Sequence, residues 1–139
     1  MTRRPAAVPA LPAIVRSALA ALRDHPGDPV AVAGVFGPVA EIGRGDPPVH
    51  VLVDEVAAVP GASMAQVIRS DAGFDVVLDL VGVGGRIEEL IRAFGPSDPD
   101  YGFRGESIFT WSLDERASLV AYADDGSLVQ RIVVREGRR

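Results

Sequence analysis

The chain has 139 residues, which is the length of one domain rather than two. Hydrophobic residues make up 47% and charged residues 24%, so the composition is that of a globular protein and excludes a largely disordered chain. The sequence contains neither cysteine nor lysine, which excludes disulfides, zinc–thiolate sites and Schiff-base chemistry. A net charge of −5 argues against sequence-independent binding of nucleic acids and against binding to anionic membranes.

Residues 1–10 are rich in proline and alanine, and we expect them to form a flexible lead-in. Arg3 and Arg4 precede an apolar run, and Ala18-Leu19-Ala20 resembles a cleavage site, so a secretory signal is one interpretation. Two prolines interrupt that run, and Arg16 separates it from the triplet. We therefore expect a cytoplasmic protein, with secretion as the alternative. No run of apolar residues is long enough to predict a transmembrane helix.

The first two predicted elements are helices. Apolar residues recur over 11–22 with the i, i+3, i+4 spacing of an amphipathic helix, and His25-Pro26-Gly27 ends the pattern. A second helix is predicted over 30–36. It begins at Asp28-Pro29, where aspartate suits the N-cap and proline the first helical position, and it ends at Gly37-Pro38.

Three strands are predicted next, over 49–53, 64–70 and 74–81. The tight turn Asp71-Ala72-Gly73 joins the last two. In the third strand, apolar side chains at the even positions alternate with two aspartates. That alternation is typical of an antiparallel strand with one face buried and one face in water.

The second half of the chain begins with another helix and continues with strands. We interpret Gly82–Gly85 as a turn rather than a phosphate loop, because the Gly-x-Gly-x-x-Gly spacing and a following lysine are missing. An amphipathic helix is predicted over 83–94, and Gly95-Pro96 ends it before a polar loop over 97–105. Three strands are predicted over 107–113, 117–123 and 127–135. Asp124-Asp125-Gly126 is the strongest hairpin signal.

Phe36-Gly37-Pro38 and Phe94-Gly95-Pro96 occupy the same place in two similar series of elements. Each follows a helix and precedes three strands, with glycine as a left-handed cap and proline as the stop. This predicts an internal repeat over 11–81 and 83–135 within a single domain of residues 11–139; coincidence is the alternative. We expect an α+β fold in which two helix–β-meander units form one or more antiparallel sheets, with the helices packed on one face.

The second half of the chain carries a resemblance to known proteins. Its motifs are the helix ending in Phe94-Gly95-Pro96, the aromatic strand Phe109-Thr110-Trp111, and the turn Ala123-Asp124-Asp125-Gly126. Together they resemble the helix–Gly-x-Pro–β-meander unit of beta-lactamase-inhibitor-like proteins and of small outer-membrane assembly lipoproteins. The chain is also similar in size to small bacterial immunity and unknown-function proteins. The resemblance implies a protein-binding scaffold that uses a sheet face and loops.

Catalytic and metal-binding patterns are not evident in the sequence. His25 adjoins a helix end, where a capping role suits it, and His50 alternates with valines on a strand; their spacing matches no metal motif. No serine lies in a Gly-x-Ser-x-Gly motif. The paired carboxylates are sequence neighbours, which do not converge on one point. We therefore expect no catalytic residue, no cofactor and no metal.

The candidate partner-binding residues lie in the second half of the chain. They are Tyr101, Phe103, Arg104, Trp111, Tyr122, Asp124 and Asp125. The first three lie in a loop flanked by glycines, and tyrosine and arginine are enriched at interface hot spots. Trp111 shares a strand face with Phe109, and two interpretations stay open. The pair either covers the core beside the last helix or forms exposed binding anchors.

We expect a non-enzymatic protein-binding module, of the immunity or inhibitor type, that blocks a protein partner. Neither a nucleic acid nor a membrane is the expected partner. One alternative is a small-molecule-binding or enzymatic domain, with a pocket between helices and sheet that includes His50, Asp54 or Arg131. Another is a secretion or chaperone adaptor that dimerises through an exposed apolar sheet edge.

Overall fold

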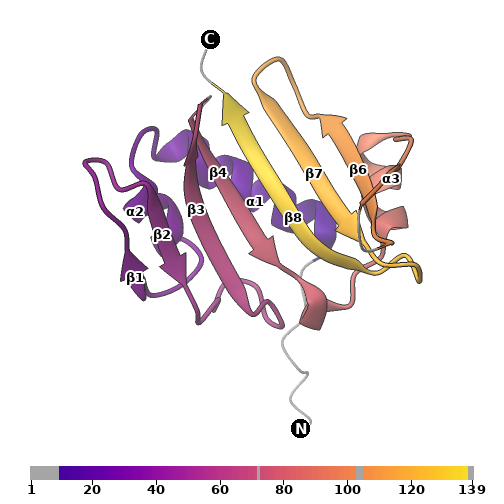
Figure 1. Cartoon of the computed structure of the whole chain (residues 1–139), viewed down its shortest axis with the longest axis horizontal. Coiled ribbons are helices and arrows are strands. Elements are labelled where there is room, and N and C mark those ends of the chain that lie inside the picture. Colours follow the sequence, from indigo (N-terminus) through magenta and orange to yellow (C-terminus); the bar gives the residue numbers. More distant parts are fainter. Residues whose placement is uncertain (1–9, 72, 103–104, 138–139) are drawn as a thin grey trace, which may run out of the picture.

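The structure, a computed structural model, describes residues 10–71, 73–102 and 105–137. These residues form three α-helices and one eight-stranded antiparallel sheet, which confirms the predicted α+β class (Figure 1). The helices are α1 (Leu11–Asp24), α2 (Pro29–Gly34) and α3 (Ile87–Phe94). The strands are β1 (Glu41–Ile42), β2 (His50–Val53), β3 (Met64–Ser70), β4 (Gly73–Asp79), β5 (Asp100–Tyr101), β6 (Ser107–Ser112), β7 (Ala117–Ala123) and β8 (Val129–Gly137).

Helix α1 buries the apolar stripe that its sequence predicts. Pro12 lies in the first turn, where its missing N–H breaks no helical hydrogen bond. The helix ends where the backbone N–H of His25 donates to the carbonyl of Ala21 at 3.1 Å. The buried side chains are Leu11, Ile14, Val15, Ala18, Ala21 and Leu22.

Helix α2 starts where predicted but is shorter. The carboxylate of Asp28 accepts a hydrogen bond from the backbone N–H of Ala31 at 3.1 Å, so the predicted N-cap is present. The helix then ends at Gly34 rather than at residue 36. Val35 and Phe36, the last residues of the predicted range, form a turn instead.

Helix α3 begins four residues later than the apolar periodicity predicts. Val81–Val83 forms a 3-10 turn, and Gly84 adopts a φ of 74°, a left-handed conformation that breaks the helical path. The carboxylate of Glu89 accepts a hydrogen bond from the N–H of Arg86 at 2.8 Å and caps the first turn of the helix. Local backbone chemistry therefore overrode the apolar pattern of residues 83–86.

The glycines of the two Phe-Gly-Pro segments have different roles. Gly95 has a φ of 100°, a positive angle that favours glycine at the end of α3. Gly37 has no positive φ, so the prediction of a left-handed cap is wrong there. A Cβ on Gly37 would lie 2.1 Å from the carbonyl oxygen of Glu55, and close approach of two backbones is what requires glycine at this position.

The six predicted strands are present, with ends displaced by a few residues. Two further strands, β1 and β5, were not predicted. Each has two residues, and all four are exposed. A run of two exposed residues carries no alternation of apolar and polar side chains, so no periodicity could indicate it.

The strands lie in the order β1-β2-β3-β4-β8-β7-β6-β5 (Figure 1). A helix followed by four strands occurs twice along the chain, as α2 with β1–β4 and α3 with β5–β8. The two sets meet at the centre of the sheet, where β4 pairs with β8 from Gly73↔Gly137 to Asp79↔Arg131.

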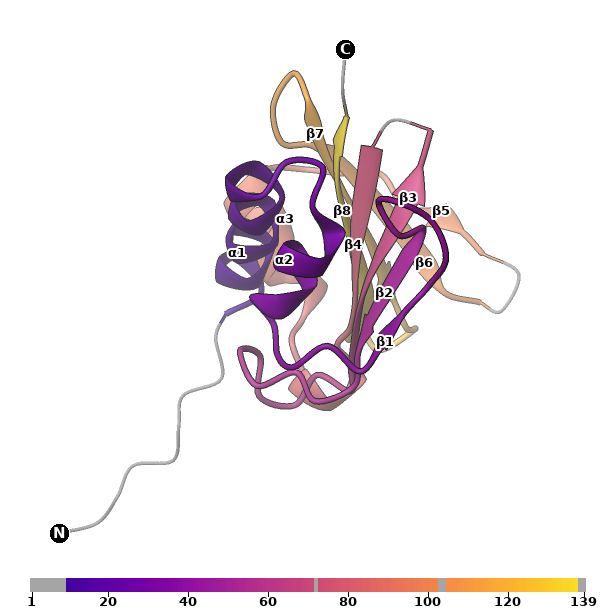
Figure 2. The same cartoon turned by 90° about the vertical axis from the view of Figure 1, so that its left-hand side faces the viewer.

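Figure 2 shows α1, α2 and α3 on the same side of the sheet. The buried side chains of the strands alternate with less buried ones, and the buried set joins the helices in one core. Phe74, Val76, Leu78 and Leu80 belong to the helix side, whereas Asp75 and Asp79 point the other way, as their alternation predicts. The largest fully buried side chains are Phe36, Leu11, Ile14, Leu78, Leu80, Leu90, Leu119 and Ile132.

Candidate functional site

The sheet face turned away from the helices, called here the open face, is composed of three rows of side chains. The middle row crosses six strands and is mostly aliphatic and half-buried, with polar ends. It contains Leu52, Gln66, Val77, Val133, Val120 and Thr110. One flanking row contains Ile68, Asp75, Arg135 and Ser118, and the other contains Met64, Asp79, Arg131, Tyr122 and Ile108.

The charged groups of the open face lie on the two central strands. On β4, Asp75 and Asp79 flank Val77, and on β8 their cross-strand neighbours are Arg135 and Arg131. The open face therefore has an acidic column beside a basic column, with an aliphatic residue in the middle of each. This arrangement follows from the register of β4 against β8, two strands that lie far apart in the sequence.

Asp75 and Arg135 form a bidentate ion pair on the open face. Two nitrogens of the Arg135 guanidinium donate to the Asp75 carboxylate, Nε to Oδ1 at 2.8 Å and Nη2 to Oδ2 at 2.7 Å. The hydroxyl of Ser70 lies 3.3 Å from the same Oδ1. These contacts bury Asp75 to 8% exposure, and the hydrogen bond to Asp75 raises the pKa of Arg135 above its ordinary value.

The second cross-strand pair, Asp79 and Arg131, makes no ion pair within the described part of the chain. Asp79 accepts a hydrogen bond from the N–H of Val81 at 3.2 Å, and the Arg131 guanidinium lies 4.3 Å from the centre of the Tyr122 ring. Arg131 is exposed. The predicted candidate Tyr122 is thus a half-buried open-face residue beneath an exposed cation.

The predicted candidate Tyr101 lies at the rim of the open face. It is 80% exposed and belongs to β5, which pairs with the outer strand β6. Figure 2 shows β5 projecting from the sheet on the side opposite the helices. Phe103 and Arg104, the other candidates of this loop, lie outside the described residues.

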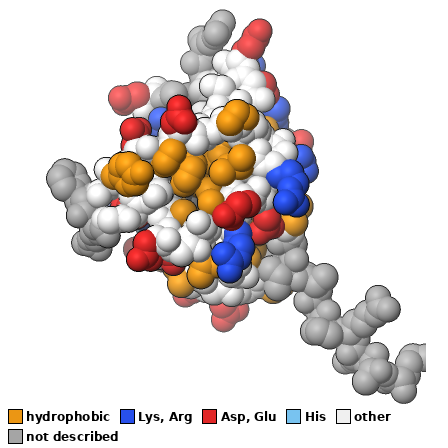
Figure 3. Space-filling view, turned by 90° about the vertical axis from the view of Figure 1, so that its right-hand side faces the viewer, with side chains coloured by type: hydrophobic (Ala, Val, Ile, Leu, Met, Phe, Trp, Pro, Cys, Tyr) orange, Lys and Arg blue, Asp and Glu red, His pale blue; other side chains and the backbone are white. Residues whose placement is uncertain are grey.

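The β6 edge of the sheet is closed by a side chain. The hydroxyl of Ser97 donates to the carbonyl of Thr110 at 2.9 Å and accepts from the N–H of Thr110 at 3.2 Å. The backbone N–H and carbonyl of Thr110 are therefore occupied and do not offer hydrogen bonds to a further strand beside β6. Figure 3 shows hydrophobic side chains gathered on this side of the molecule. The partly buried hydrophobic residues of the core include Ile91 and Phe94 of α3 and Leu113, which follows β6.

Trp111 belongs to the core and is not an exposed anchor. It is 5% exposed, and its Nε1–H donates to the carbonyl of Gly95 at 2.8 Å, which ties β6 to the end of α3. The ring of Phe109 is stacked with it at 6.0 Å between centroids. Of the two interpretations of this pair, the structure supports the core one, so Trp111 is removed from the candidate contact residues.

The two candidate aspartates of the β7–β8 turn differ in role. One carboxylate oxygen of Asp124 accepts hydrogen bonds from the N–H groups of Gly126 and Leu128, both at 2.9 Å. Asp124 therefore shapes the turn, as a short polar side chain commonly does. Asp125 is exposed.

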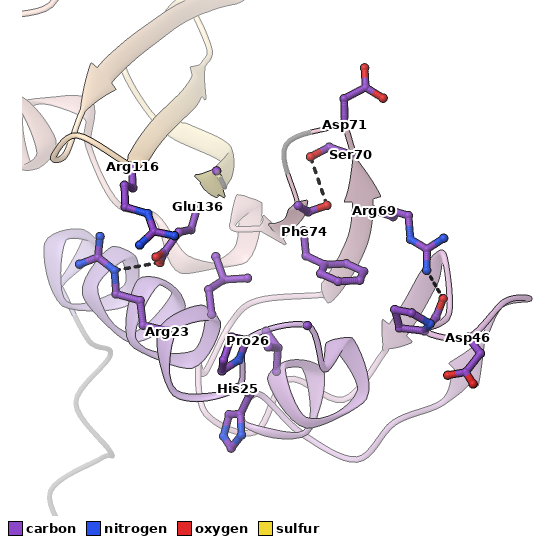
Figure 4. A pocket seen from close by; sticks show the side chains of 16 residues that line it. Arg23, His25, Pro26, Asp46, Arg69, Ser70, Asp71, Phe74, Arg116 and Glu136 are labelled. Atoms are coloured by element: carbon purple, nitrogen blue, oxygen red, sulfur yellow. Dashed lines mark hydrogen bonds and ion pairs between the residues drawn. The ribbon is translucent and has the colours of Figure 1, made fainter. Parts of the chain in front are cut away.

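A pocket of about 750 Å³ lies beside the end of α1 and the β3–β4 turn (Figure 4). Its apolar lining includes Leu22, Val32 and Phe74. Arg69 lies 5.9 Å from the centre of the Phe74 ring and donates to the carbonyl of Pro47. The polar groups on the opposite wall come from α1, the β6–β7 loop and the end of β8.

Most of the charged side chains on that wall form ion pairs. Arg23 bridges Asp114 and Glu136, with its Nε 2.8 Å from the Glu136 carboxylate. The hydrogen bond from Arg23 and, second, one from the N–H of Arg116 lower the pKa of Asp114 below its ordinary value. The Arg116 guanidinium itself has no hydrogen bond or ion pair among the described residues, although it lines the pocket.

The pocket is not the one that the sequence predicts. His50, Asp54 and Arg131, the residues expected to line a pocket between helices and sheet, are absent from its lining. His50 lies on β2 and Arg131 on β8, so the sheet does not bring them together. The lining comes from distant segments, and no local motif could have indicated it.

Comparisons with protein-family models, with curated proteins and with solved structures found no match. The described residues contain no group of three or more histidine, aspartate or glutamate side chains placed to hold a metal ion. Within the same residues, no helix has the length and apolar character needed to cross a membrane. The family resemblance of the second half therefore stays a prediction.

Proposed function

We propose that the protein is a non-enzymatic protein-binding module and that the open face of its sheet is the contact surface. The observation that carries this proposal is the aliphatic row formed by Leu52, Val77, Val133 and Val120, which no helix or strand of the described residues covers. Half-buried aliphatic side chains with charged residues around them are typical of surfaces that bury against another protein.

The chemistry of the open face favours a protein over a nucleic acid. Its two arginines are balanced by two aspartates, and the whole chain carries a net charge of −5. A phosphate backbone would be attracted to a surplus of positive charge, which this face lacks. An aliphatic centre, by contrast, gains free energy when another apolar surface removes it from water.

The sharper form of the proposal is an immunity- or inhibitor-type protein that blocks its partner. The projecting strand β5 with the exposed Tyr101 supports this form. A projection beside the open face would contact the side of a partner that packs on that face. We also propose that the two halves are related as a repeat. The support is the series of one helix and four strands that occurs twice and meets at β4 and β8.

Site-specific photo-crosslinking tests the contact surface. A benzophenone amino acid replaces Tyr122 on the open face, and in a matched variant it replaces Arg92, an exposed residue of α3 on the helix side. Both proteins are irradiated in an extract of the cells that produce the chain. We expect a discrete protein adduct from position 122 and none from position 92.

Two further measurements make the crosslinking decisive. The adduct at position 122 should disappear when excess unmodified protein competes, but persist when the competitor carries Val133→Arg, which puts a charge in the aliphatic row. Mass spectrometry then identifies the crosslinked peptide. Adducts that form equally at positions 92 and 122, or only at position 92, would contradict the proposal.

The pocket at the end of α1 favours a second candidate function, the binding of a small molecule. Its volume of about 750 Å³ lies in the range of ligand sites. The Phe74 ring and the Arg116 guanidinium, which has no ion pair within the described chain, suit a ligand with an apolar ring and a carboxylate. A thermal-shift screen of aromatic carboxylates and their uncharged amides tests this candidate. We expect a rise in melting temperature with the carboxylates alone, lost in Arg116→Gln; equal shifts with the amides would refute it.

A further inference from the structure

We infer that the partner of the open face is a second copy of this chain, packed face to face about a two-fold axis that runs parallel to the strands between β4 and β8. This inference rests on the proposed function in its general form, a protein-binding open face, and it replaces the immunity or inhibitor form, because a face covered by a second copy has no room for another partner. The juxtaposition that carries it is the pair of oppositely charged columns on the two central strands.

The symmetry argument starts from the positions of the columns. A two-fold rotation about an axis parallel to the strands exchanges the place of β4 with that of β8 across the interface. The acidic β4 column of one copy then lies over the basic β8 column of the other, twice. In the middle row the same operation places Val77 over Val133 of the second copy.

The alternative symmetric arrangement is unfavourable. A two-fold axis perpendicular to the strands would place β4 over β4, so that Asp75 would meet Asp79 of the second copy and Arg135 would meet Arg131. Like charges brought together at an interface cost free energy and exclude that arrangement. The charge pattern therefore selects one of the two ways in which the face can pack on itself.

The unused charges of the open face are the ones that this packing satisfies. Asp75 and Arg135 already neutralise each other, but Asp79 and Arg131 make no ion pair in the described chain. In the face-to-face dimer, Arg131 of each copy lies opposite Asp79 of the other copy, so the contact occurs twice. The strands of two aligned sheets cross at about −30°, and this rotation within the plane of the interface displaces least the side chains near its centre, between β4 and β8.

The same axis fixes a more distant contact. Met64 on β3 and Tyr122 on β7 lie in the same row, on opposite sides of the β4–β8 centre. The rotation therefore places Tyr122 over Met64 of the second copy. A thioether beside an aromatic ring is a favourable contact, and it gives the crosslinking experiment a defined target.

A charge-reversal experiment tests the inference. The full chain is studied by sedimentation equilibrium and light scattering over a wide concentration range, with folding of each variant checked by circular dichroism. We expect a dimer for the wild type. Arg131→Asp and Asp79→Arg each place like charges opposite one another and should raise the dimer dissociation constant at least about tenfold.

Mixing separates an interface from a merely structural effect. In an equal mixture of Arg131→Asp and Asp79→Arg, the mixed pair has opposite charges at both contacts, so we expect a heterodimer with affinity near that of the wild type. Repulsion within one chain cannot be relieved by mixing. Arg92→Asp and Glu88→Arg, on exposed positions of α3, are the charge-matched controls and should leave the dimer unchanged.

The outcomes distinguish a failure of the dimer inference from a failure of the proposed protein-binding function. A wild type that stays monomeric, a dimer that both open-face reversals leave intact, or folded variants that stay monomeric when mixed would each overturn the inference. If the benzophenone at position 122 then labels another protein, the proposed function survives without it. A crosslink from position 122 to Met64 of a second copy supports both.

Discussion

The two faces of the sheet are made from alternate residues of the same strands, yet one face is buried and the other is partly exposed to solvent. On β8, Val134 is 0% exposed beneath the helices, whereas its neighbour Val133 is half-buried on the open face. Both are valines in the same strand, so neither residue type nor strand propensity distinguishes them. What distinguishes them is the layer packed above, because the helices of the described chain cover the side of Val134 and not that of Val133. A residue on the open face therefore remains available for a partner.

The largest expected effect contrasts these two valines. Val134→Ala removes two buried methyl groups from a core that cannot fully collapse, and we expect it to lower the free energy of unfolding by about 2 kcal/mol. Val133→Ala should cost less than about 1 kcal/mol in the monomer, because solvent already reaches this side chain. Urea denaturation at a concentration where the chain is monomeric measures both. Equal costs would refute the sidedness of β8.

Two aromatic residues give the next contrast. Trp111→Phe on the covered face leaves the carbonyl of Gly95 without its hydrogen-bond donor, and we expect a loss of about 1–2 kcal/mol. Tyr122→Phe on the open face removes a hydroxyl that has no hydrogen bond among the described residues, so stability should hardly change. Thermal denaturation of the two variants checks this order, and a larger loss for Tyr122→Phe would reverse it.

A smaller effect is expected at the ion pair of the open face. Asp75→Asn removes the charge that the Arg135 fork binds, and we expect a cost of about 1 kcal/mol, because the Arg135 side chain is 48% exposed and solvent screens the pair. Asp125→Asn in the β7–β8 turn is the control of the same chemistry, with an exposed carboxylate. Chemical denaturation of both variants should place Asp125→Asn within error of the wild type.

The smallest effect is pH-dependent and lies at the ion pair between Arg23 of α1 and Asp114 of the β6–β7 loop. The pKa of Asp114 is lowered in the folded state by Arg23, so this carboxylate stabilises the fold above the pKa that it has in the unfolded chain. That contribution is lost as the pH falls through the folded pKa. Arg23→Ala should therefore lower the melting temperature slightly at neutral pH and by less at a pH well below the ordinary aspartate value. A difference that grows on acidification would contradict this assignment.

Local sequence patterns predicted the elements that depend on near neighbours. The α1 stripe, the Asp28 N-cap and the alternation around Asp75 all involve residues within one or two turns or a single strand, so their physical causes are visible in a short window. The start of α3 was misplaced because the left-handed Gly84 outweighs the apolar pattern before it. The strands β1 and β5 are too short to leave any pattern.

The positions of the candidate residues could be predicted only in part. Tyr101 is exposed at the rim, Tyr122 lies on the open face and Asp125 is exposed, and their role as partner contacts stays a prediction. Trp111 turned out to be a core residue, because alternation alone does not tell which strand face the helices cover. The charged columns and the pocket escaped prediction, since their members come from strands and loops far apart in the chain.

By itself the sequence determined the helices, most strands, the tight turns and the absence of thiol and lysine chemistry, because these follow from residue type and from contacts between near neighbours. Only the tertiary structure decided that β4 lies beside β8, which sets Asp75 against Arg135 across 60 positions of sequence. Strand order and the covered side are collective outcomes of packing three helices on one sheet. The sequence of a single strand does not determine them, because its alternating pattern shows only that one of its two faces is buried, whatever its neighbours in the sheet.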